Sequence, residues 1–225
     1  MSDSIAKAIV FDLDNTLIDF LRMKRLCCEA AIDAMISAGL KMDRKKGWQT
    51  FYQLYKEHGF ENQKIFQKFM KKVHGKIDYG IMASGTVAYR RVKEGLLYPY
   101  PNVVPTLDEL RKRYKLAILT DAPKIQGWIR LAAMKIYDKF DIIVTFDETK
   151  ATKPSPKPFL YVLKKLKLKP EECLFVGDSL IRDIAPAKKL GFKTAFAKYG
   201  GSCETTKVKP DYVLDDIKDL LKIRI

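Results

Sequence analysis

Long apolar runs are missing from this 225-residue sequence, and residues arranged to bind a transition metal are scarce. No run approaches the roughly 20 apolar residues that a helix needs to cross a bilayer. The chain has only two histidines, and its four cysteines have neither zinc-site nor disulfide-framework spacing. The first four residues lack the basic-then-apolar layout of a signal peptide. These absences argue against a membrane protein, a zinc protein and a secreted disulfide scaffold. They predict a cytoplasmic protein with reduced cysteines.

The sequence is strongly basic, with 42 Lys and Arg against 27 Asp and Glu and a formal net charge of +15. Such an excess is found in proteins that bind nucleic acid, an anionic surface or an anionic substrate. No nucleic-acid recognition motif accompanies it, and no dense basic run is interleaved with aromatic residues. We therefore expect neither nucleic acid nor membrane as a partner. A non-enzymatic, basic nucleic-acid-binding protein is kept as the alternative from another functional class.

One apolar run near the N-terminus ends in two carboxylates. Ala8–Phe11 leads directly into Asp12-Leu13-Asp14. An unbroken apolar run predicts a strand buried on both faces, as in a parallel sheet covered by helices, and such sheets bind ligands just beyond the carboxyl ends of their strands. Because residues two apart on an extended chain point to the same side, Asp12 and Asp14 are expected to face one site. A bound cation there would offset their mutual repulsion.

The remainder of the chain falls into two regions with different hydrophobic patterns. Residues 16–95 contain four amphipathic segments, the first three ending at Gly39, Gly59 and Gly75, which predicts an antiparallel helical bundle. Beyond Leu97, short apolar runs at 116–119, 142–146, 174–176, 194–197 and 212–214 alternate with helical segments. This alternation predicts an α/β fold with a doubly wound parallel sheet, into which the bundle is inserted after the first strand.

Polar residues follow the later strands as well. Thr120 and Asp121 follow one run, Asp178 follows another, and Asp183 lies five residues further on. Lys153 lies in a proline-rich loop that should hold it in a fixed position. Carboxylates with few nitrogen ligands suit Mg²⁺, and a lysine with a hydroxyl suits the oxygens of a phosphoryl group. A strand-end carboxylate can attack phosphorus, while a second can protonate the leaving oxygen and then activate water.

Taken singly, these residues also fit structural roles. An isolated lysine such as Lys153 is usually solvated. Thr120 and Asp183 fit helix caps, and Asp178 after a glycine fits an ordinary turn. The order and spacing of the whole set favour the catalytic interpretation.

The set resembles the four signatures of the haloacid dehalogenase superfamily of hydrolases. Residues 12–16 match the first signature, Thr120 the second, Lys153 the third and residues 177–183 the fourth. The resemblance implies a Rossmann-like catalytic core formed by residues 1–15 and 96–225. It also implies that residues 16–95 form a helical cap.

The resemblance further implies a role for each site residue. Asp12 corresponds to the nucleophile and Asp14 to the general acid/base. Thr120 and Lys153 correspond to ligands of the substrate phosphoryl group, with Asp121 beside them. The implied cofactor is Mg²⁺, and its implied ligands are Asp12, Asp14 through its backbone carbonyl, Asp178 and Asp183.

The presence or absence of an aspartate at the position of Asp14 distinguishes two branches of this family. Members that cleave carbon–halogen bonds lack the second aspartate, because a halide leaving group needs no protonation. We therefore expect a phosphatase that depends on Mg²⁺ and hydrolyses small phosphorylated metabolites through an aspartyl-phosphate. A phosphomutase or a haloacid dehalogenase-type hydrolase is the alternative within the family. A response-regulator receiver is disfavoured because receivers are about half this length.

Overall fold

The computed structural model describes residues 6–201 and 205–223. The chain forms two compact units, Met1–Asp19 with Tyr98–Ile225, and Phe20–Leu97. The sequence places the first boundary earlier, at residue 15. Residues 16–19 belong with the sheet because the backbone of Ile18 pairs with Asp14 and Pro99, and Tyr100 N donates to Leu17 O at 2.9 Å. The assignment of these units as catalytic core and cap stays a prediction.

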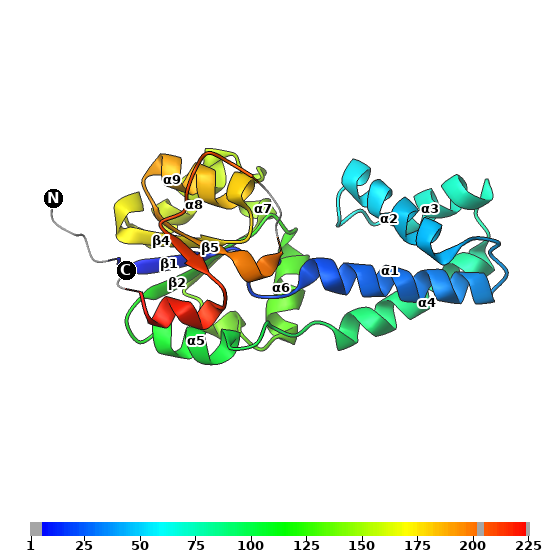
Figure 1. Cartoon of the computed structure of the whole chain (residues 1–225), viewed down its shortest axis with the longest axis horizontal. Coiled ribbons are helices and arrows are strands. Elements are labelled where there is room, and N and C mark those ends of the chain that lie inside the picture. Colours follow the sequence, from blue (N-terminus) through cyan, green and yellow to red (C-terminus); the bar gives the residue numbers. More distant parts are fainter. Residues whose placement is uncertain (1–5, 202–204, 224–225) are drawn as a thin grey trace. The chain divides into compact units, whose positions relative to one another are not determined.

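A six-stranded sheet forms the centre of the first unit (Figure 1). Its order is β3-β2-β1-β4-β5-β6, and all five strand pairs are parallel. The strands are β1 (Ala8–Phe11), β2 (Lys115–Leu119), β3 (Ile142–Val144), β4 (Cys173–Gly177), β5 (Lys193–Ala197) and β6 (Tyr212–Leu214). The order reverses at β1, which lies between β2 and β4, so the carboxyl end of β1 is the switch point at which such sheets bind ligands. The predicted doubly wound α/β fold is confirmed.

Helices cover both faces of this sheet. In Figure 1, α8 and α9 lie on one side of the sheet and α5 on the other. The α-helices of this unit are α5 (Val103–Leu110), α6 (Lys124–Ala133), α7 (Phe146–Thr149), α8 (Pro156–Leu166) and α9 (Ala185–Leu190). Among the described residues, short 3₁₀ or π-helical turns are η1 (Tyr137–Lys139), η2 (Pro170–Glu172), η3 (Leu180–Ile184), η4 (Lys198–Gly200) and η5 (Ile217–Leu221).

The core under α8 is aromatic. The ring of Phe159 on α8 lies 5.1 Å from that of Phe175 on β4 and 6.2 Å from that of Phe192, measured between centroids. Val10 of β1 belongs to the same buried cluster. Burial of these side chains holds β1 and β4 side by side, and their carboxyl ends carry the site.

Several element boundaries differ from the sequence prediction by a few residues, and two of these differences have a clear local cause. The run 142–146 ends as a strand at Val144, because Thr145 caps α7 and its backbone N–H donates to the Glu148 carboxylate at 2.8 Å. The helix expected from Asp183 begins earlier, with the π-helical turn η3, and Ser179 caps it by accepting from Arg182 N at 3.0 Å. Asp183 is therefore not the N-cap.

The second unit contains four helices, as predicted: α1 (Phe20–Ser37), α2 (Arg44–His58), α3 (Ile65–His74) and α4 (Tyr79–Gly95). The stacked rings of Phe51 and Phe69, 3.9 Å apart, join α2 to α3. Gly85 lets α4 approach α1, because a Cβ at this position would collide with Met35. Among the described residues of the whole chain, no helix is long and apolar enough to span a membrane.

Candidate active site

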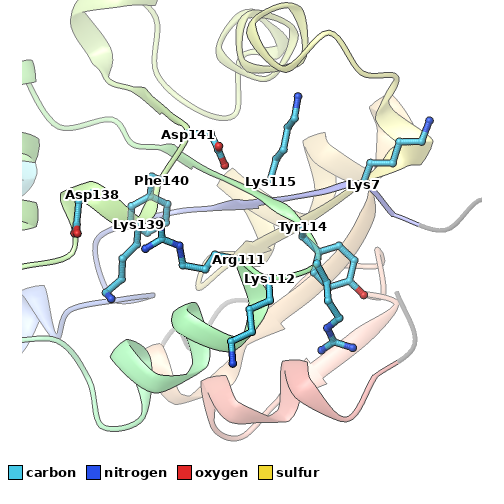
Figure 2. Close-up of a pocket in the computed structure, with 10 residues that line it drawn as sticks. Lys7, Arg111, Lys112, Tyr114, Lys115, Asp138, Lys139, Phe140 and Asp141 are labelled. Atoms are coloured by element: carbon cyan, nitrogen blue, oxygen red, sulfur yellow. The ribbon is translucent and has the colours of Figure 1, made fainter.

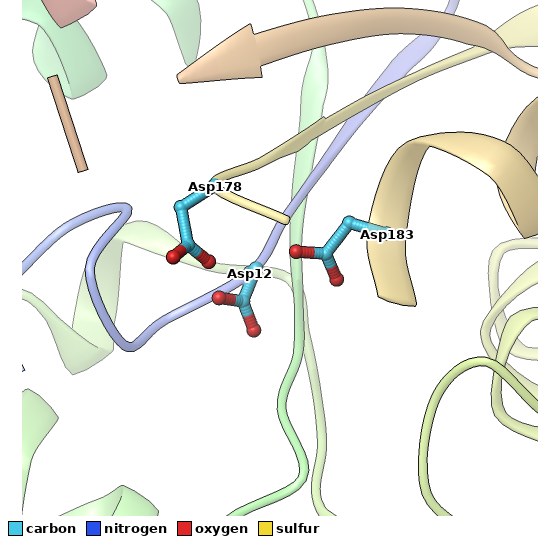
Figure 3. A group of neighbouring side chains, drawn as sticks. All are labelled: Asp12, Asp178 and Asp183. Atoms are coloured by element: carbon cyan, nitrogen blue, oxygen red, sulfur yellow. The ribbon is translucent and has the colours of Figure 1, made fainter. Parts of the chain in front are cut away.

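Three carboxylates meet at the carboxyl ends of β1 and β4. Asp12 follows β1, Asp178 follows β4 and Asp183 lies in η3. One carboxylate oxygen of each lies within 4.8 Å of the others, and Figure 3 shows the three groups gathered at this edge of the sheet. The three residues are 3, 5 and 0% exposed. Three buried acids this close to one another repel strongly unless cations neutralise them.

Lys153 supplies one such cation. Its Nζ lies 2.5 Å from Asp12 Oδ1 and 2.7 Å from Asp183 Oδ1, and it also donates to Leu119 O at 3.3 Å. Burial disfavours the charged ammonium, but the carboxylates of Asp12 and Asp183 outweigh this effect and raise the pKa of Lys153 above its usual value. The lysine is therefore a charged part of the site and not a solvated surface residue.

One lysine does not neutralise the cluster. Burial, together with the charges of Asp12 and Asp183, raises the pKa of Asp178 to about 8 against the opposing effect of Lys153. Burial likewise raises the pKa of Asp12 to about 7, although Lys153 opposes this shift. Within the described residues, Oδ1 of Asp178 is buried and has no hydrogen-bond partner. A buried carboxylate oxygen without a donor, beside two further carboxylates, fits a hard divalent cation such as Mg²⁺.

Thr120 and Asp121 follow β2, the strand next to β1. Thr120 is 3% exposed, and its hydroxyl accepts from Ala122 N at 3.1 Å, which shapes the turn that leads to α6. Thr120 does not cap α6, whose N-cap is Pro123. The carboxylate of Asp121 accepts from Lys153 N at 2.9 Å and lies 3.5 Å from the Arg182 guanidinium. Asp121 thus fixes the loop that carries Lys153.

Asp14 lies apart from the three clustered carboxylates. Its side chain is not a member of that group, and its Oδ2 lies 2.9 Å from an Arg130 guanidinium nitrogen on α6. Arg130 is only 2% exposed. Arg130 lies on the buried face of α6, beside Gly127 and Leu131. This position is the sequence signal that could have predicted its burial, but the sequence analysis did not identify Arg130 as a site residue.

The structure also identifies two glycines that the sequence analysis did not single out as contacts of the acids. A Cβ on Gly177 would lie 2.6 Å from the Asp183 carboxylate. A Cβ on Gly200, in η4, would collide with Asn15 O and lie 2.7 Å from Asp178 Cβ. Only glycine leaves room for the acids at both places.

The comparisons with known proteins agree with this geometry. Residues 6–191 match the family model described as haloacid dehalogenase-like hydrolase. This chain belongs to that family. The chain is 35% identical over 219 residues to the glyceraldehyde 3-phosphate phosphatase of Methanocaldococcus jannaschii, with 96% of each covered. It is 33% identical to the protein of the same name from Pyrococcus furiosus, with 96% of this chain and 92% of the relative covered.

Solved structures of the family match along nearly the full chain. A HAD phosphatase from Thermococcus onnurineus is 26% identical, with a TM-score of 0.66 and coverage of 97% of this chain and 100% of that one. A magnesium-bound HAD hydrolase from Bacillus subtilis has a TM-score of 0.74 at 18% identity, with 97% and 98% covered, and this match shows the fold. The predicted enzyme class, a phosphoric monoester hydrolase, is confirmed. The roles of the individual residues stay predictions.

Proposed function

We propose that this hydrolase is a Mg²⁺-dependent phosphatase that acts on small phosphorylated metabolites by way of an aspartyl-phosphate on Asp12. One observation carries the proposal: Lys153 lies between Asp12 and Asp183 in a buried cluster whose carboxylates exceed its cations. Such a site would hold a divalent metal ion, whose charge would favour the binding of a dianionic phosphoryl group.

In the first step, a carboxylate oxygen of Asp12 attacks phosphorus, a bond forms between them, and the ester P–O bond breaks. Lys153 and the hydroxyl of Thr120 bind the non-bridging oxygens as negative charge builds on them. Asp14 donates its proton to the departing alkoxide, so the alcohol leaves neutral. Arg130 orients the Asp14 side chain through the 2.9 Å contact and stabilises the carboxylate that remains once the proton has left.

In the second step, Asp14 takes a proton from water, and the water oxygen attacks phosphorus. The bond from phosphorus to Asp12 breaks, which releases inorganic phosphate and restores the carboxylate. Mg²⁺ would be held by Asp12, Asp178 and the backbone carbonyl of Asp14, with Asp183 in support. Its positive charge would offset the carboxylates and the phosphoryl oxygens.

The relatives named glyceraldehyde 3-phosphate phosphatase make that three-carbon ester the first substrate to test. Residues 20–97 act as the helical cap in this proposal. A cytoplasmic location belongs to the same proposal and is supported by Cys27, Cys28 and Cys173, which are buried free thiols.

The test measures phosphate release from a panel of phosphate esters that includes glyceraldehyde 3-phosphate, in Mg²⁺ and in EDTA. The wild type is compared with Asp12→Asn and with Asp215→Asn, an aspartate whose side chain is 77% exposed. We expect release that requires Mg²⁺, persists in Asp215→Asn and is lost in Asp12→Asn. Undiminished release in EDTA or in Asp12→Asn would contradict the proposal.

A further inference from the structure

A basic cavity lies at the end of the sheet opposite to the carboxylates. It has a volume of about 400 Å³ and opens at the amino ends of β1 and β2, where Lys7 and Lys115 are located (Figure 2). Its other lining residues come from the segment after α5 and from the segment that leads into β3, and they are Arg111, Lys112, Arg113, Tyr114, Asp138, Lys139, Phe140 and Asp141. Because the strands next to it are four and five residues long, at ~3.3 Å per residue, roughly 15 Å separates this cavity from Asp12.

Backbone pairing brings these segments together. Lys115 N donates to Lys7 O at 3.0 Å, and Asp141 N donates to Leu116 O at 2.8 Å. Leu110 and Leu116, which flank the basic segment after α5, are fully buried. Strand pairing and the burial of these leucines therefore fix the backbone that carries the cations before any ligand binds.

Six of the lining residues are basic and two are acidic. Three of the cations are paired with carboxylates: Lys7 with Glu172 at 2.7 Å, Lys112 with Glu109 at 2.7 Å and Lys139 with Asp108 at 2.5 Å. Within residues 6–201 and 205–223, Arg111, Arg113 and Lys115 have no acidic partner. The acid nearest in sequence to β3, Asp141, already accepts from Leu116 N at 2.9 Å.

Ordinary helix chemistry explains only part of this arrangement. Basic residues just after α5 interact favourably with the partial negative charge at its C-terminus, which accounts for Arg111 and Lys112. It does not account for Lys7 and Lys115, which line the same cavity at the amino ends of two neighbouring strands. Among the described residues, the cations of this cavity without an acidic partner are Arg111, Arg113 and Lys115, whose like charges repel one another, and an anionic ligand removes that repulsion.

We propose that this cavity binds a small polyanion that carries two or more phosphoryl groups. The volume lies in the range of small-molecule sites, and guanidinium groups with ammonium groups are the usual ligands of phosphate oxygens. Arg111, Arg113 and Lys115 together carry three positive charges without an acidic partner among the described residues, which is more than one phosphate dianion neutralises. A nucleic acid would need a continuous basic track, whereas these residues surround one concavity. This ligand is distinct from the proposed substrate, because it binds at the opposite end of the sheet and does not react there.

The test is isothermal titration calorimetry with tripolyphosphate in EDTA. The chelator stops metal-dependent hydrolysis, and it leaves the cluster of Asp12, Asp178 and Asp183 without a metal, so that cluster repels a polyanion. The wild type is compared with the double variant Arg111→Glu/Lys115→Glu. The matched control is Lys164→Glu/Lys189→Glu, which makes the same change in net charge at exposed positions on α8 and α9.

We expect saturable binding of one tripolyphosphate that weakens as salt is raised. The loss of each cation should raise Kd roughly tenfold. The Arg111/Lys115 double variant should therefore bind about 100-fold or more weakly, and the control within a few-fold of the wild type. If charge reversal prevents folding, Arg111→Gln/Lys115→Gln should still bind at least tenfold more weakly.

Several outcomes would overturn the proposal. These are no binding by the wild type, equal weakening in the control pair, or wild-type affinity in the glutamine pair. A duplex RNA that binds through Arg111 and Lys115 while tripolyphosphate does not would also overturn it, in favour of a nucleic-acid surface. Phosphatase assays in Mg²⁺ keep the two proposals separate. The Arg111 and Lys115 variants should retain phosphate release whether or not tripolyphosphate binds.

Discussion

Nζ of Lys153 lies 2.5 Å from Oδ1 of Asp12, although 141 residues separate the two in the chain. Both side chains are almost completely buried. A short ion pair that is shielded from solvent fixes the direction of the Asp12 carboxylate. The second contact of Lys153, with Asp183, holds the ammonium group between two carboxylates. The proposed nucleophile is thus held in place before substrate arrives.

Replacing Lys153 by methionine removes this cation and leaves three buried acids uncompensated. We predict that Lys153→Met lowers kcat/KM by about 10²–10³ or more, because a charge that stabilises the transition state is lost. In EDTA the free energy of unfolding should fall by about 3–5 kcal/mol, measured by urea denaturation. Lys157→Met, at an exposed position on α8, is the control and should change neither quantity appreciably. Wild-type kcat/KM in Lys153→Met would contradict this assignment.

Metal removal should make stability depend on pH. In metal-free protein, burial raises the pKa of Asp178 to about 8 and that of Asp12 to about 7, against ~4 in an unfolded chain. Between pH ~4 and ~8 the folded state then binds more protons than the unfolded state. Its free energy of unfolding should therefore fall as pH rises through this window.

Urea denaturation in EDTA at pH 5 and pH 8 measures this effect, and the same pair of experiments in Mg²⁺ is the control. The decrease in EDTA should exceed about 1 kcal/mol, the equivalent of less than one unit of pKa shift. Mg²⁺ should remove most of it, because the cation favours the ionised carboxylates. Equal or greater stability at pH 8 in EDTA would show that the three acids are not coupled as the structure indicates.

The leaving group should reveal the role of Asp14. A general acid matters most when the departing oxygen is strongly basic, so Asp14→Asn should slow an alkyl phosphate by about 10²–10⁴. An aryl ester such as p-nitrophenyl phosphate departs without protonation and should lose much less in the step that cleaves the ester. Single-turnover rates for both esters test this. If neither ester is cleaved more slowly in this step, Asp14 acts in the water step alone, and equal losses for both esters would contradict its role as the acid for the leaving group.

Arg130 should act through Asp14. Arg130→Met removes the buried guanidinium that lies 2.9 Å from the Asp14 carboxylate, and we predict a loss of about tenfold or more in kcat with little change in KM. Arg130→Lys keeps a charge but not the planar fork and should retain more activity than Arg130→Met. A change confined to KM would indicate that Arg130 contacts the substrate instead.

Gly177 should not tolerate a side chain. A Cβ there would lie 2.6 Å from Asp183, whose carboxylate contacts Lys153 and accepts from Ser179 N at 3.1 Å. We predict that Gly177→Ala displaces Asp183, lowers kcat and raises the Mg²⁺ concentration needed for half-maximal activity. The control is Gly95→Ala, because a Cβ at this position would meet no other atom within 4 Å. Gly39 is unsuitable because its positive φ would strain an alanine. Unchanged metal dependence in Gly177→Ala would contradict the prediction.

The sheet, and the meeting of acids from two strand ends at one edge of it, could be predicted from the sequence because both depend on local pattern. Apolar runs ending in Asp12 and Asp178 predict neighbouring strand ends, since the carboxyl ends of parallel strands lie at one edge. Arg130 and Gly200 were missed because their roles depend on how α6 and η4 pack against that edge, which no local pattern records. Asp183 was expected near the site. Its complete burial follows from the π-helical turn η3, and the spacing of residues in the sequence does not predict such a turn.

The covalent step on Asp12 is tested most directly by rapid acid quenching of a reaction with p-nitrophenyl phosphate that carries a radiolabelled phosphoryl group, because this ester is cleaved without a proton from Asp14. The protein is Asp14→Asn in Mg²⁺, because loss of the residue that activates water should let the phosphorylated enzyme accumulate. The account predicts that the label is found on the peptide that contains Asp12 and is absent when Asp12→Asn is added. Label on a different residue, or phosphate release at the wild-type rate by Asp12→Asn alone, would contradict it.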